Sequence, residues 1–538
     1  MNRFFKGFIL FLLTIAMVFT FCACTQEAEA EVAVERITLN ITSKTIVSGE
    51  TFQIVATAYP ENASQEFTYS VQSKYASNLT VSASGLLKGK NTGNDTTSGI
   101  TVTVASKDYP SVYKTCKIYV AVAPPSSFSL PKAINMVTSG PGEDSSSNIV
   151  ISWHAKAENS VLEYKKEGDA EYTSKAVTGT KTTANWADLN DSTKFYRCKE
   201  VLTGLKADTD YVYRIKTSDG VYTSPEAHFR TAASDTTFQF MWLSDLHAPK
   251  GGSTYIQRVK ELIDLANTKD GVDLDFCLFT GDMVNKGQIY KHWNYWSDSG
   301  YLNNMVYAFV CGNHDYYPYG TKDRTTNAYF KDFAAYPTNN EEGGKSVLDS
   351  NYWFIWNRVL FVCIDNFTSE GTLLSGSGRT VAEQKAWFKA VVEANEGEYD
   401  YLVYAQHLPF FINDEPCEYG QYTDWYALFD EYKVDFALSS DEHAYTRTKP
   451  LLNNSAVALT EGKVTSGTIY ITSFETEGSS IGTPSNSASA TAKYAAFYGG
   501  GGVGGGVYFT VTPTEMTMHL IGAGGVEKDS VTVVKKTR

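Results

Sequence analysis

Short apolar runs, each followed by polar or turn residues, recur through the second half of the chain. They span residues 238–243, 274–279, 305–310 and 434–438. Such runs are typical of buried strands. Between them, residues 255–266 and 382–394 place apolar side chains three and four positions apart, which predicts amphipathic helices. Alternating strands and helices favour a layered α/β domain with mixed β-sheets, which we place at residues 236–538, its C-terminal part being rich in β-structure.

The first part of the chain follows a different pattern, in which apolar and polar residues alternate one by one. Segments of this kind fill residues 34–122 and 128–235 and are separated by turn residues, as in all-β sandwiches. The stretch 123–127 contains two prolines and is predicted to be a stiff linker. We expect Trp153 in a core, and His154 at the surface or hydrogen-bonded. The predicted fold class is multidomain, with two all-β sandwiches before the α/β domain.

The start of the chain has the pattern of an export signal. A basic beginning precedes an apolar run, residues 7–21, that is too short to span a membrane comfortably. Cys24 stands where a lipid-modified cysteine is expected, and cleavage after Ala30 is the alternative. We therefore expect residues 1–24 to be a signal peptide of the lipoprotein type and residues 25–33 a tether. The protein is expected on the outer face of a bacterial cell membrane, held by lipid, or else secreted.

Net charge narrows the class of partner. The formal net charge is −14, without long acidic runs. Nucleic acid is disfavoured as a bulk partner, because its phosphates bind to clustered lysine and arginine. A small phosphoester stays accessible if bound cations supply local positive charge. Membrane contact is expected only through the lipid anchor.

Six cysteines follow the signal segment, spread singly and without C-x-x-C spacing. They are Cys116, Cys198, Cys277, Cys311, Cys363 and Cys417. This spacing predicts neither a zinc ribbon nor a disulfide-dense scaffold. Cys277, Cys311 and Cys363 lie in apolar runs and are predicted to be small buried hydrophobic residues. A structural disulfide between some pair stays open.

Four polar blocks follow the apolar runs. They are Asp245-Leu246-His247, Gly281-Asp282-Met283-Val284-Asn285, Gly312-Asn313-His314-Asp315 and Asp441-Glu442-His443. His407 stands between the last two, and four of the eight histidines lie in these segments. One such block alone would be an ordinary turn or helix cap. Ligands of layered α/β sheets gather at the carboxyl ends of strands, so the shared order predicts one site that binds cations.

This order resembles the calcineurin-like metallophosphoesterase superfamily, whose pattern runs D-x-H, G-D-x-x, G-N-H-D/E, H and G-H-x-H. The resemblance covers roughly residues 236–475 and is closest to the purple acid phosphatase branch. Residues 443–447 (H-A-Y-T-R) and 407–411 (H-L-P-F-F) are similar to motifs of that branch. Residues 202–211 look like part of the fibronectin-like domain that precedes its catalytic domain.

The first sandwich resembles a second known family. Residues 59–63 and 84–86 are similar to group-two bacterial immunoglobulin-like domains. Such domains act as spacers or adhesins, and we favour a spacer.

The resemblance implies a role for each matched position. A first metal ion would be held by Asp245, His247, Asp282 and His443. A second would be held by Asp282, which bridges the two, and by Asn313, His407 and Asp441. The implied cofactors are two divalent or trivalent ions of Fe, Mn or Zn. A hydroxide bound to one of them would attack phosphorus. His314 would protonate the leaving oxygen. Asp315 is expected to orient the His314 ring, or else to be a solvated or capping aspartate.

The chain departs from the superfamily pattern at Asp441, where an imidazole is usual. A carboxylate shifts the second site toward hard oxygen chemistry, so we expect Mn, Mg or Fe there rather than Zn. The alternative is that this substitution weakens or abolishes the second site, leaving a mononuclear or inactive protein.

The chain also departs from the purple branch at Asn285, where a tyrosine phenolate binds iron and makes the colour. With no phenolate there, and with His247 supplying the first metal instead, we expect a colourless enzyme.

Aromatic residues are abundant near the blocks. They are Tyr290, Trp293, Tyr295, Trp296, Tyr316, Tyr317 and Tyr319. They are expected either to stack on a nucleoside or sugar or to pack the loops.

The leading functional hypothesis is an exported metallophosphoesterase that hydrolyses phosphomonoesters. Phosphodiesters are the near alternative. Two hypotheses from other classes are a catalytically weakened surface binding protein and a surface adhesin in which the hydrolase domain is secondary.

Overall fold

The computed structural model describes most of the chain, in two compact units, Met1–Ala123 and Pro124–Arg538. The described residues are 32–47, 49–90, 99–121, 132–182, 195–233, 237–248, 253–269, 271–299, 304–317, 326–369, 372–373, 380–476, 491–499 and 505–538. The predicted signal segment with Cys24, most of the tether, the linker 123–127 and Tyr319 lie outside them. In this described part no helix combines the length and apolar character needed to cross a membrane.

The first unit is a β-sandwich. One sheet has the order β2-β9-β8-β5, another has the order β3-β7-β6, and β1 pairs with β4. Along β8 (Ile100–Ser106) buried and half-buried residues alternate, because successive side chains of a strand point to opposite faces. This confirms the alternating pattern predicted from the sequence. The other strands are β1 (Arg36–Leu39), β2 (Ser43–Val47), β3 (Thr51–Gln53), β4 (Ala56–Tyr59), β5 (Phe67–Val71), β6 (Leu79–Val81), β7 (Leu86–Gly89) and β9 (Tyr113–Ala121).

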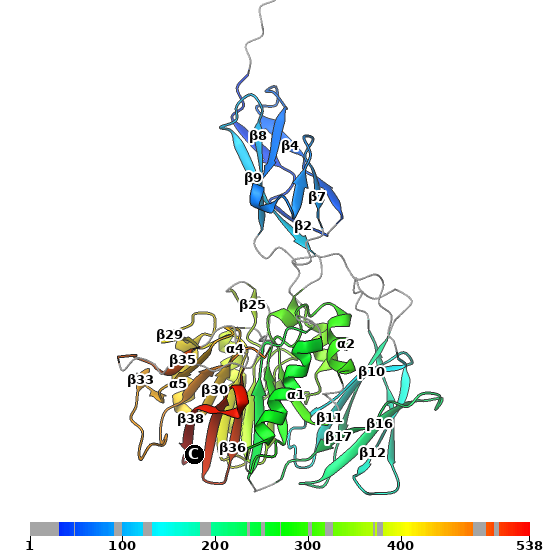
Figure 1. Ribbon diagram of the computed structural model, residues 1–538, viewed down its shortest axis with the longest axis vertical. Coiled ribbons are helices and arrows are strands. Elements are labelled where there is room, and N and C mark those ends of the chain that lie inside the picture. Colours follow the sequence, from blue (N-terminus) through cyan, green and yellow to red (C-terminus); the bar gives the residue numbers. More distant parts are fainter. Residues whose placement is uncertain are drawn as a thin grey trace, which may run out of the picture. The chain divides into compact units, whose positions relative to one another are not determined.

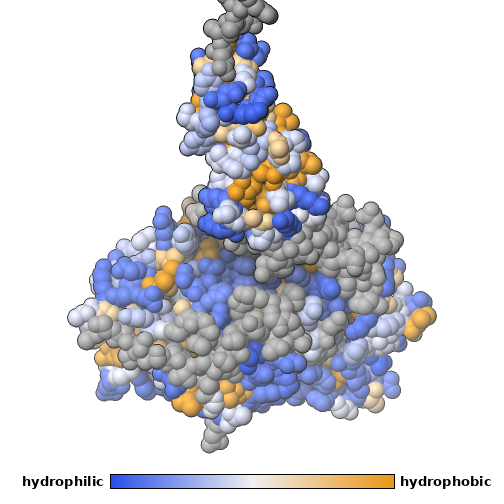
Figure 2. Space-filling model, turned by 45° about the horizontal axis from the view of Figure 1, so that its top comes forward, coloured by the Kyte–Doolittle hydropathy of each residue, from blue (hydrophilic) through white to orange (hydrophobic). Residues whose placement is uncertain are grey.

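The surface of this first unit is partly apolar. Val55, Leu86 and Tyr113 are exposed large hydrophobic residues, and Figure 2 shows hydrophobic residues gathered on the visible face of the unit. The spacer and adhesin interpretations both stay open.

The second unit begins with a sandwich of two four-stranded antiparallel sheets, of order β10-β11-β15-β14 and β13-β12-β16-β17. Their strands are β10 (Ile134–Pro141), β11 (Ile149–Ala155), β12 (Asn159–Lys166), β13 (Thr173–Thr178), β14 (Thr180–Lys181), β15 (Tyr196–Leu202), β16 (Asp210–Thr217) and β17 (Ala227–Arg230). Trp153 is fully buried, as predicted, and its indole N–H donates to Ser160 Oγ at 3.0 Å.

His154 is also fully buried, so the surface alternative for it is wrong. Every residue of β11 is buried, because the α/β domain covers the outer face of this sheet. His154 Nδ1 lies 2.9 Å from the Tyr290 hydroxyl of that domain. Ser152 Oγ donates to the Asp332 carbonyl at 2.7 Å across the same interface. The sandwich and the α/β domain therefore share a buried, partly polar contact.

The α/β domain consists of two stacked mixed sheets. The first has the order β20-β19-β18-β36-β37-β38, and the second has the order β23-β24-β27-β30-β34-β31-β35. In the first, β18, β19 and β20 run parallel, and in the second β24, β27, β30 and β34 do. The strands of the first are β18 (Phe238–Leu243), β19 (Phe276–Thr280), β20 (Val306–Val310), β36 (Gly506–Val511), β37 (Glu515–Ile521) and β38 (Glu527–Val534). Those of the second are β23 (Tyr352–Trp356), β24 (Val359–Cys363), β27 (Tyr401–Ala405), β30 (Phe436–Ser439), β31 (Tyr445–Thr448), β34 (Ile469–Thr472) and β35 (Ala495–Gly499).

Aromatic rings fill the space between the two sheets. Phe240 meets Phe361 edge to face at 5.3 Å and stacks on Phe276 at 5.1 Å. Phe436 meets Phe509 at 5.1 Å. These strands are buried on both faces, because helices cover the outer sides.

Among the described residues, α-helices border the sheets (Figure 1), and they include both predicted ones. They are α1 (Ser253–Asn267), α2 (Tyr290–Asp298), α3 (Ala328–Phe333), α4 (Val381–Ala394) and α5 (Tyr422–Glu431). Helix α4 begins at a capping box, in which Thr380 and Glu383 each accept the other's backbone N–H. Its Trp387 and Phe388 belong to the apolar cluster on the outer face of β24, with Leu360 and Val362.

The six cysteines at positions 116 to 417 are all described, and all are buried and free. The disulfide that the sequence left open is therefore not formed. Cys277, Cys311 and Cys363 are fully buried in strand or strand-end positions, as predicted.

Candidate metal centre

The predicted ligands come from the carboxyl ends of five strands. Asp245 and His247 follow β18, Asp282 follows β19, Asn313 and His314 follow β20, His407 follows β27, and Asp441 and His443 follow β30. The first three strands are parallel neighbours in one sheet, and the other two are parallel neighbours in the second sheet. The stacked sheets bring both sets of ends to one place.

Five of these residues have left-handed backbone conformations. They are Asp245 (φ 52°), His247 (φ 51°), Asp282 (φ 55°), Asp441 (φ 72°) and His443 (φ 56°). A non-glycine residue in this region costs of order 1–3 kcal/mol, and such residues cluster at functional sites. The backbone is bent in this way because each loop must turn sharply to aim its side chain at the same point.

Two glycines permit the close approach of these loops. Gly281 has φ +95°, and a Cβ there would lie 2.4 Å from His407 Nδ1. A Cβ on Gly312 would lie 2.3 Å from Asp282 Oδ1. Neither position accepts a side chain unless the metal-binding loops separate.

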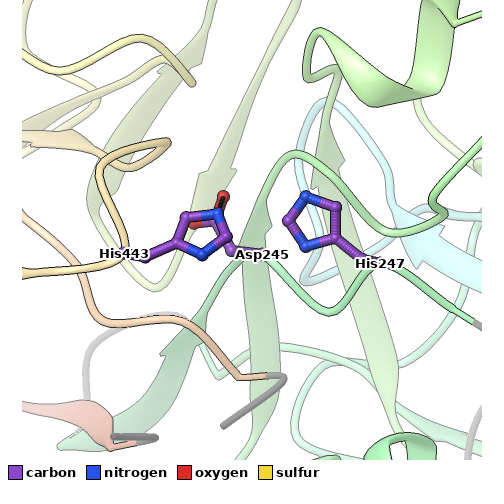
Figure 3. A group of neighbouring side chains, drawn as sticks. All are labelled: Asp245, His247 and His443. Carbon is purple, nitrogen blue, oxygen red and sulfur yellow. Dashed lines mark ion pairs between the residues drawn. The ribbon is translucent and has the colours of Figure 1, made fainter. Parts of the chain in front are cut away.

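Asp245, His247 and His443 offer ligand atoms that all lie within 4.8 Å of one another. In Figure 3 the Asp245 carboxylate overlaps the His443 ring, and the His247 imidazole lies to their right. Ser244 Oγ donates to Asp245 Oδ2 at 2.5 Å. Asp245 Oδ1 is buried and accepts no hydrogen bond from the described residues, and His443 Nε2 lies 3.5 Å from it. A buried carboxylate oxygen of this kind is suited to a cation.

Asp282 faces both halves of the centre. Its Oδ2 lies 3.0 Å from His247 Nε2, and its Oδ1 lies 3.3 Å from His407 Nε2. Although burial alone would raise the pKa of Asp282, the neighbouring histidines outweigh burial and hold its pKa well below the usual value. Each oxygen of this carboxylate thus lies beside an imidazole of a different predicted metal site.

The second half of the centre gathers around His407. Its Nε2 lies 3.2 Å from Asn313 Oδ1 and 3.4 Å from Asp441 Oδ1. Its Nδ1 lies 2.7 Å from the Thr280 carbonyl. Because a carbonyl only accepts, Nδ1 carries a proton, and Nε2 is the ring nitrogen that faces the centre. Although burial lowers the pKa of His407, the carboxylates of Asp282 and Asp441 outweigh it and raise the pKa well above its usual value. Asp441, which replaces an imidazole, therefore reaches the second predicted site.

His314 joins His247 and Asp282 in a further group whose possible ligand atoms all lie within 4.8 Å of one another. Its backbone N–H donates to Asp282 Oδ1 at 2.8 Å, and its ring meets the His247 ring edge to face at 4.4 Å. Its Nδ1 lies 3.0 Å from the Asn285 carbonyl. Desolvation by the surrounding groups lowers the pKa of His314 to about 3. The imidazole is therefore neutral in the molecule as it stands, with Nδ1–H donating to Asn285 and Nε2 left for proton exchange.

The expected role of Asp315 is wrong. Its carboxylate does not orient the His314 ring, whose Nδ1 faces the Asn285 carbonyl. Instead it accepts backbone N–H groups from Gly312 at 2.9 Å, Asp282 at 3.1 Å and Val284 at 3.4 Å. Burial, with Asp282 nearby, raises its pKa well above the usual value. It is buried and is not a simple helix cap, because its hydrogen bonds join two loops, the one after β19 and the one after β20.

Most of the aromatic residues near the blocks pack the loops. Four of them, Tyr290, Trp293, Trp296 and Tyr316, are fully or almost fully buried. Tyr317 instead lies at the centre, with its ring 4.1 Å from the His314 ring and its hydroxyl 3.2 Å from Asn313 Nδ2. Tyr317 is the described residue of this set that can meet a substrate beside His314.

Sequence reasoning missed the groups behind the ligands. Glu475 Oε2 lies 2.7 Å from His443 Nδ1, and Ser244 and Thr280 hold Asp245 and His407. Glu475 comes three residues after β34, so it follows the same order of strand and then acid as the ligands. That signal was available, but no motif marked it.

The donor set fits hard or borderline cations. Carboxylate and amide oxygens from Asp245, Asp282, Asn313 and Asp441 combine with imidazole nitrogens from His247, His407 and His443. Mixed O and N donors of this kind suit Mn, Fe and Zn. The chain therefore offers ligands for two metal ions bridged by one carboxylate.

Three parts of the chain match known families. Residues 238–445 match the calcineurin-like phosphoesterases, residues 135–231 match the N-terminal domain of purple acid phosphatases, and residues 33–116 match the group-two bacterial Ig-like domains. These matches confirm the three resemblances drawn from the sequence.

Relatives and solved structures agree on the fold. Two uncharacterized proteins from two strains of Mycobacterium tuberculosis are 24% identical over 58% of this chain and 61% of their own length. The chain thus spans about three fifths of the length of these curated relatives. A purple acid phosphatase, PPD1, from yellow lupin seeds has a TM-score of 0.58 at 14% identity, covering 93% of this chain and 96% of its own. PhoD has a TM-score of 0.53 at 14% identity, covering 76% and 92%. At this identity the likeness shows the fold alone.

Proposed function

We propose that this chain, whose residues 238–445 match the calcineurin-like phosphoesterases, hydrolyses phosphomonoesters at a centre of two metal ions. The observation that carries the proposal is the placement of Asp282, whose two oxygens lie 3.0 Å and 3.3 Å from imidazoles of the two halves of the site. A shared carboxylate is how two-metal hydrolases hold their cations close together.

Two cations at this centre would activate a water molecule for attack on phosphorus and offset the negative charge of the phosphoryl oxygens. The chain supplies the rest of the chemistry. When protonated from solvent, His314 can donate the Nε2 proton to the leaving oxygen. Asn285 fixes the ring for this step through its carbonyl.

The test is turnover of an aryl phosphate and of an aryl phosphodiester by metal-reconstituted protein. Hydrolysis of the monoester in preference to the diester supports the proposal. Preference for the diester would assign the chain to the near alternative on the same fold. If no metal supports turnover, the alternative hypothesis is favoured, in which Asp441 weakens the second site and the chain is a surface binding protein.

We also propose that the protein is exported and held by lipid on Cys24 at the outer face of a bacterial cell membrane. The support is the sequence pattern of residues 1–24, a basic start and a short apolar run before Cys24. The resident metals and the phosphoester substrate would then be acquired outside the cytoplasm.

The second site is expected to hold Mn or Fe rather than Zn. Asp441 places a carboxylate 3.4 Å from His407 Nε2 where an imidazole is usual, which favours harder cations. Metal analysis of protein purified without added metals checks this, with Asp441→His expected to shift the content toward zinc. Two zinc ions per wild-type chain with full activity would contradict it.

Iron-loaded protein is expected to show no strong visible absorption band. Asn285 stands three residues after Asp282 and offers no phenolate. The nearby Tyr317 hydroxyl accepts a hydrogen bond from Asn313 Nδ2 at 3.2 Å. The absorption spectrum of iron-reconstituted protein checks this, and a purple band in the wild type would contradict the prediction.

A further inference from the structure

A segment outside the four polar blocks lies next to Asp245 and His443, two predicted ligands of the first metal ion. Residues 473–476 follow β34 and are anchored at both ends. Ser473 N–H donates to the Ser439 carbonyl at 2.9 Å, at the end of β30. Thr476 N–H donates to the Ser244 carbonyl at 2.9 Å, next to Asp245. The segment is therefore fixed between the two loops that carry Asp245 and His443.

This segment directs one buried carboxylate at His443. Glu475 is 7% exposed, and its Oε2 lies 2.7 Å from His443 Nδ1. A carboxylate accepts, so Nδ1 carries the proton of this contact. The other ring nitrogen, Nε2, then presents its lone pair toward Asp245, whose Oδ1 is 3.5 Å away.

The partner of His443 differs in charge from the Nδ1 partners of two other histidines at the centre. His407 directs Nδ1 at the Thr280 carbonyl, and His314 directs Nδ1 at the Asn285 carbonyl. Both carbonyls are neutral acceptors. An anionic acceptor raises the basicity of the opposite ring nitrogen more than a neutral one does, and so strengthens its bond to a cation.

We infer that Glu475 is a positioning residue for the first metal ion. It holds His443 in the Nδ1-protonated tautomer, fixes the ring toward Asp245, and makes Nε2 a stronger ligand. Glu475 touches neither substrate nor cation, and its effect passes through His443. The inference rests on the proposed function only in requiring a metal ion at Asp245 and His443.

The test measures metal binding rather than turnover. Metal-free wild-type, Glu475→Leu and Glu475→Gln proteins are titrated with Mn²⁺ by calorimetry. Glu475→Leu is expected to weaken one of the two sites about 10- to 100-fold, the usual effect of losing such a partner. Glu475→Gln is expected to fall between Leu and wild type, because its amide oxygen still accepts from Nδ1 but carries no charge.

Glu442→Gln is the control for charge alone. Glu442 precedes His443 in the sequence and is exposed, so its loss should leave the affinities within about threefold of wild type. Thermal unfolding of each metal-free variant shows whether it folds, and Glu475→Gln decides the question if Glu475→Leu does not.

Wild-type affinity at both sites in a folded Glu475→Leu or Glu475→Gln protein overturns the inference, as does an equal loss in Glu442→Gln. A wild-type chain that binds no metal overturns the proposed function, and this inference with it. Tight binding by the wild type without phosphoester turnover overturns the proposed function alone.

Discussion

Asp282→Asn is expected to abolish phosphoester hydrolysis, lowering kcat by at least about a thousandfold. Removing one electrostatic stabiliser of a transition state typically costs a hundred- to a thousandfold, and this carboxylate serves both halves of the centre. Its Oδ2 and Oδ1 lie 3.0 Å and 3.3 Å from His247 and His407. An amide keeps the shape but presents one neutral oxygen, so it cannot bridge two cations. Hydrolysis of an aryl phosphate at saturating metal measures the effect.

The metal content of this variant shows whether activity is lost because cations no longer bind or because the reaction itself is slower. We expect Asp282→Asn to bind fewer than two ions per chain. The matched control is Asp264→Asn on α1, an exposed aspartate paired with Lys260 one helical turn away. Exposed pairs of this kind contribute little, so wild-type kinetics are expected for the control. An Asp282→Asn protein with two tightly bound metals and wild-type turnover would refute the bridging role.

Asp315→Ala is expected to destabilise the fold by about 3–6 kcal/mol and to release the metals. Its carboxylate accepts the backbone N–H groups of Gly312, Asp282 and Val284. Each buried N–H left without a partner costs about 1–3 kcal/mol. A loss of this size is a large part of the usual stability of a domain, about 5–15 kcal/mol. The free energy of unfolding of metal-free protein in denaturant measures it.

Asp315→Asn tests whether acceptance of hydrogen bonds is the cause. Its amide oxygen can still accept, but its NH₂ group meets another donor, so an intermediate loss is expected. Asp264→Ala, which removes an exposed carboxylate, should change the free energy of unfolding by less than about 0.5 kcal/mol. Equal stability of Asp315→Ala and wild type would show that the loops hold without this residue.

The strands of the α/β domain were predictable because their apolar runs are continuous. The run 238–243 coincides with β18 (Phe238–Leu243). The run 434–438 was placed less well, since β30 begins at Phe436. Asp435 interrupts the apolar pattern, and it is fully buried because Lys536 and Arg538 pair with it. A charge buried by residues about a hundred positions away leaves no local signal.

The candidate metal ligands were predictable for a different reason. Each one follows a buried strand by two to four residues, so the order of strand and donor survives in the sequence. Contacts made across the fold do not survive in this way. The partners of Asp315 are backbone groups, which every residue carries, and the partner of His443 is Glu475, 32 positions later. The burial of His154 depends on a neighbouring domain that covers its sheet.

The pairing of β18 with β36 sets the order in which the protein can mature. The strand that leads to Asp245 and His247 has one neighbour in β19, nearby in sequence, and another in residues 506–511. During synthesis the sheet stays incomplete until that distant segment has emerged. Contacts between such separated segments form late, since the intervening loop must first be closed. The loops that hold Asp245 and His247 therefore gain their final support only after residues 506–511 have paired with β18.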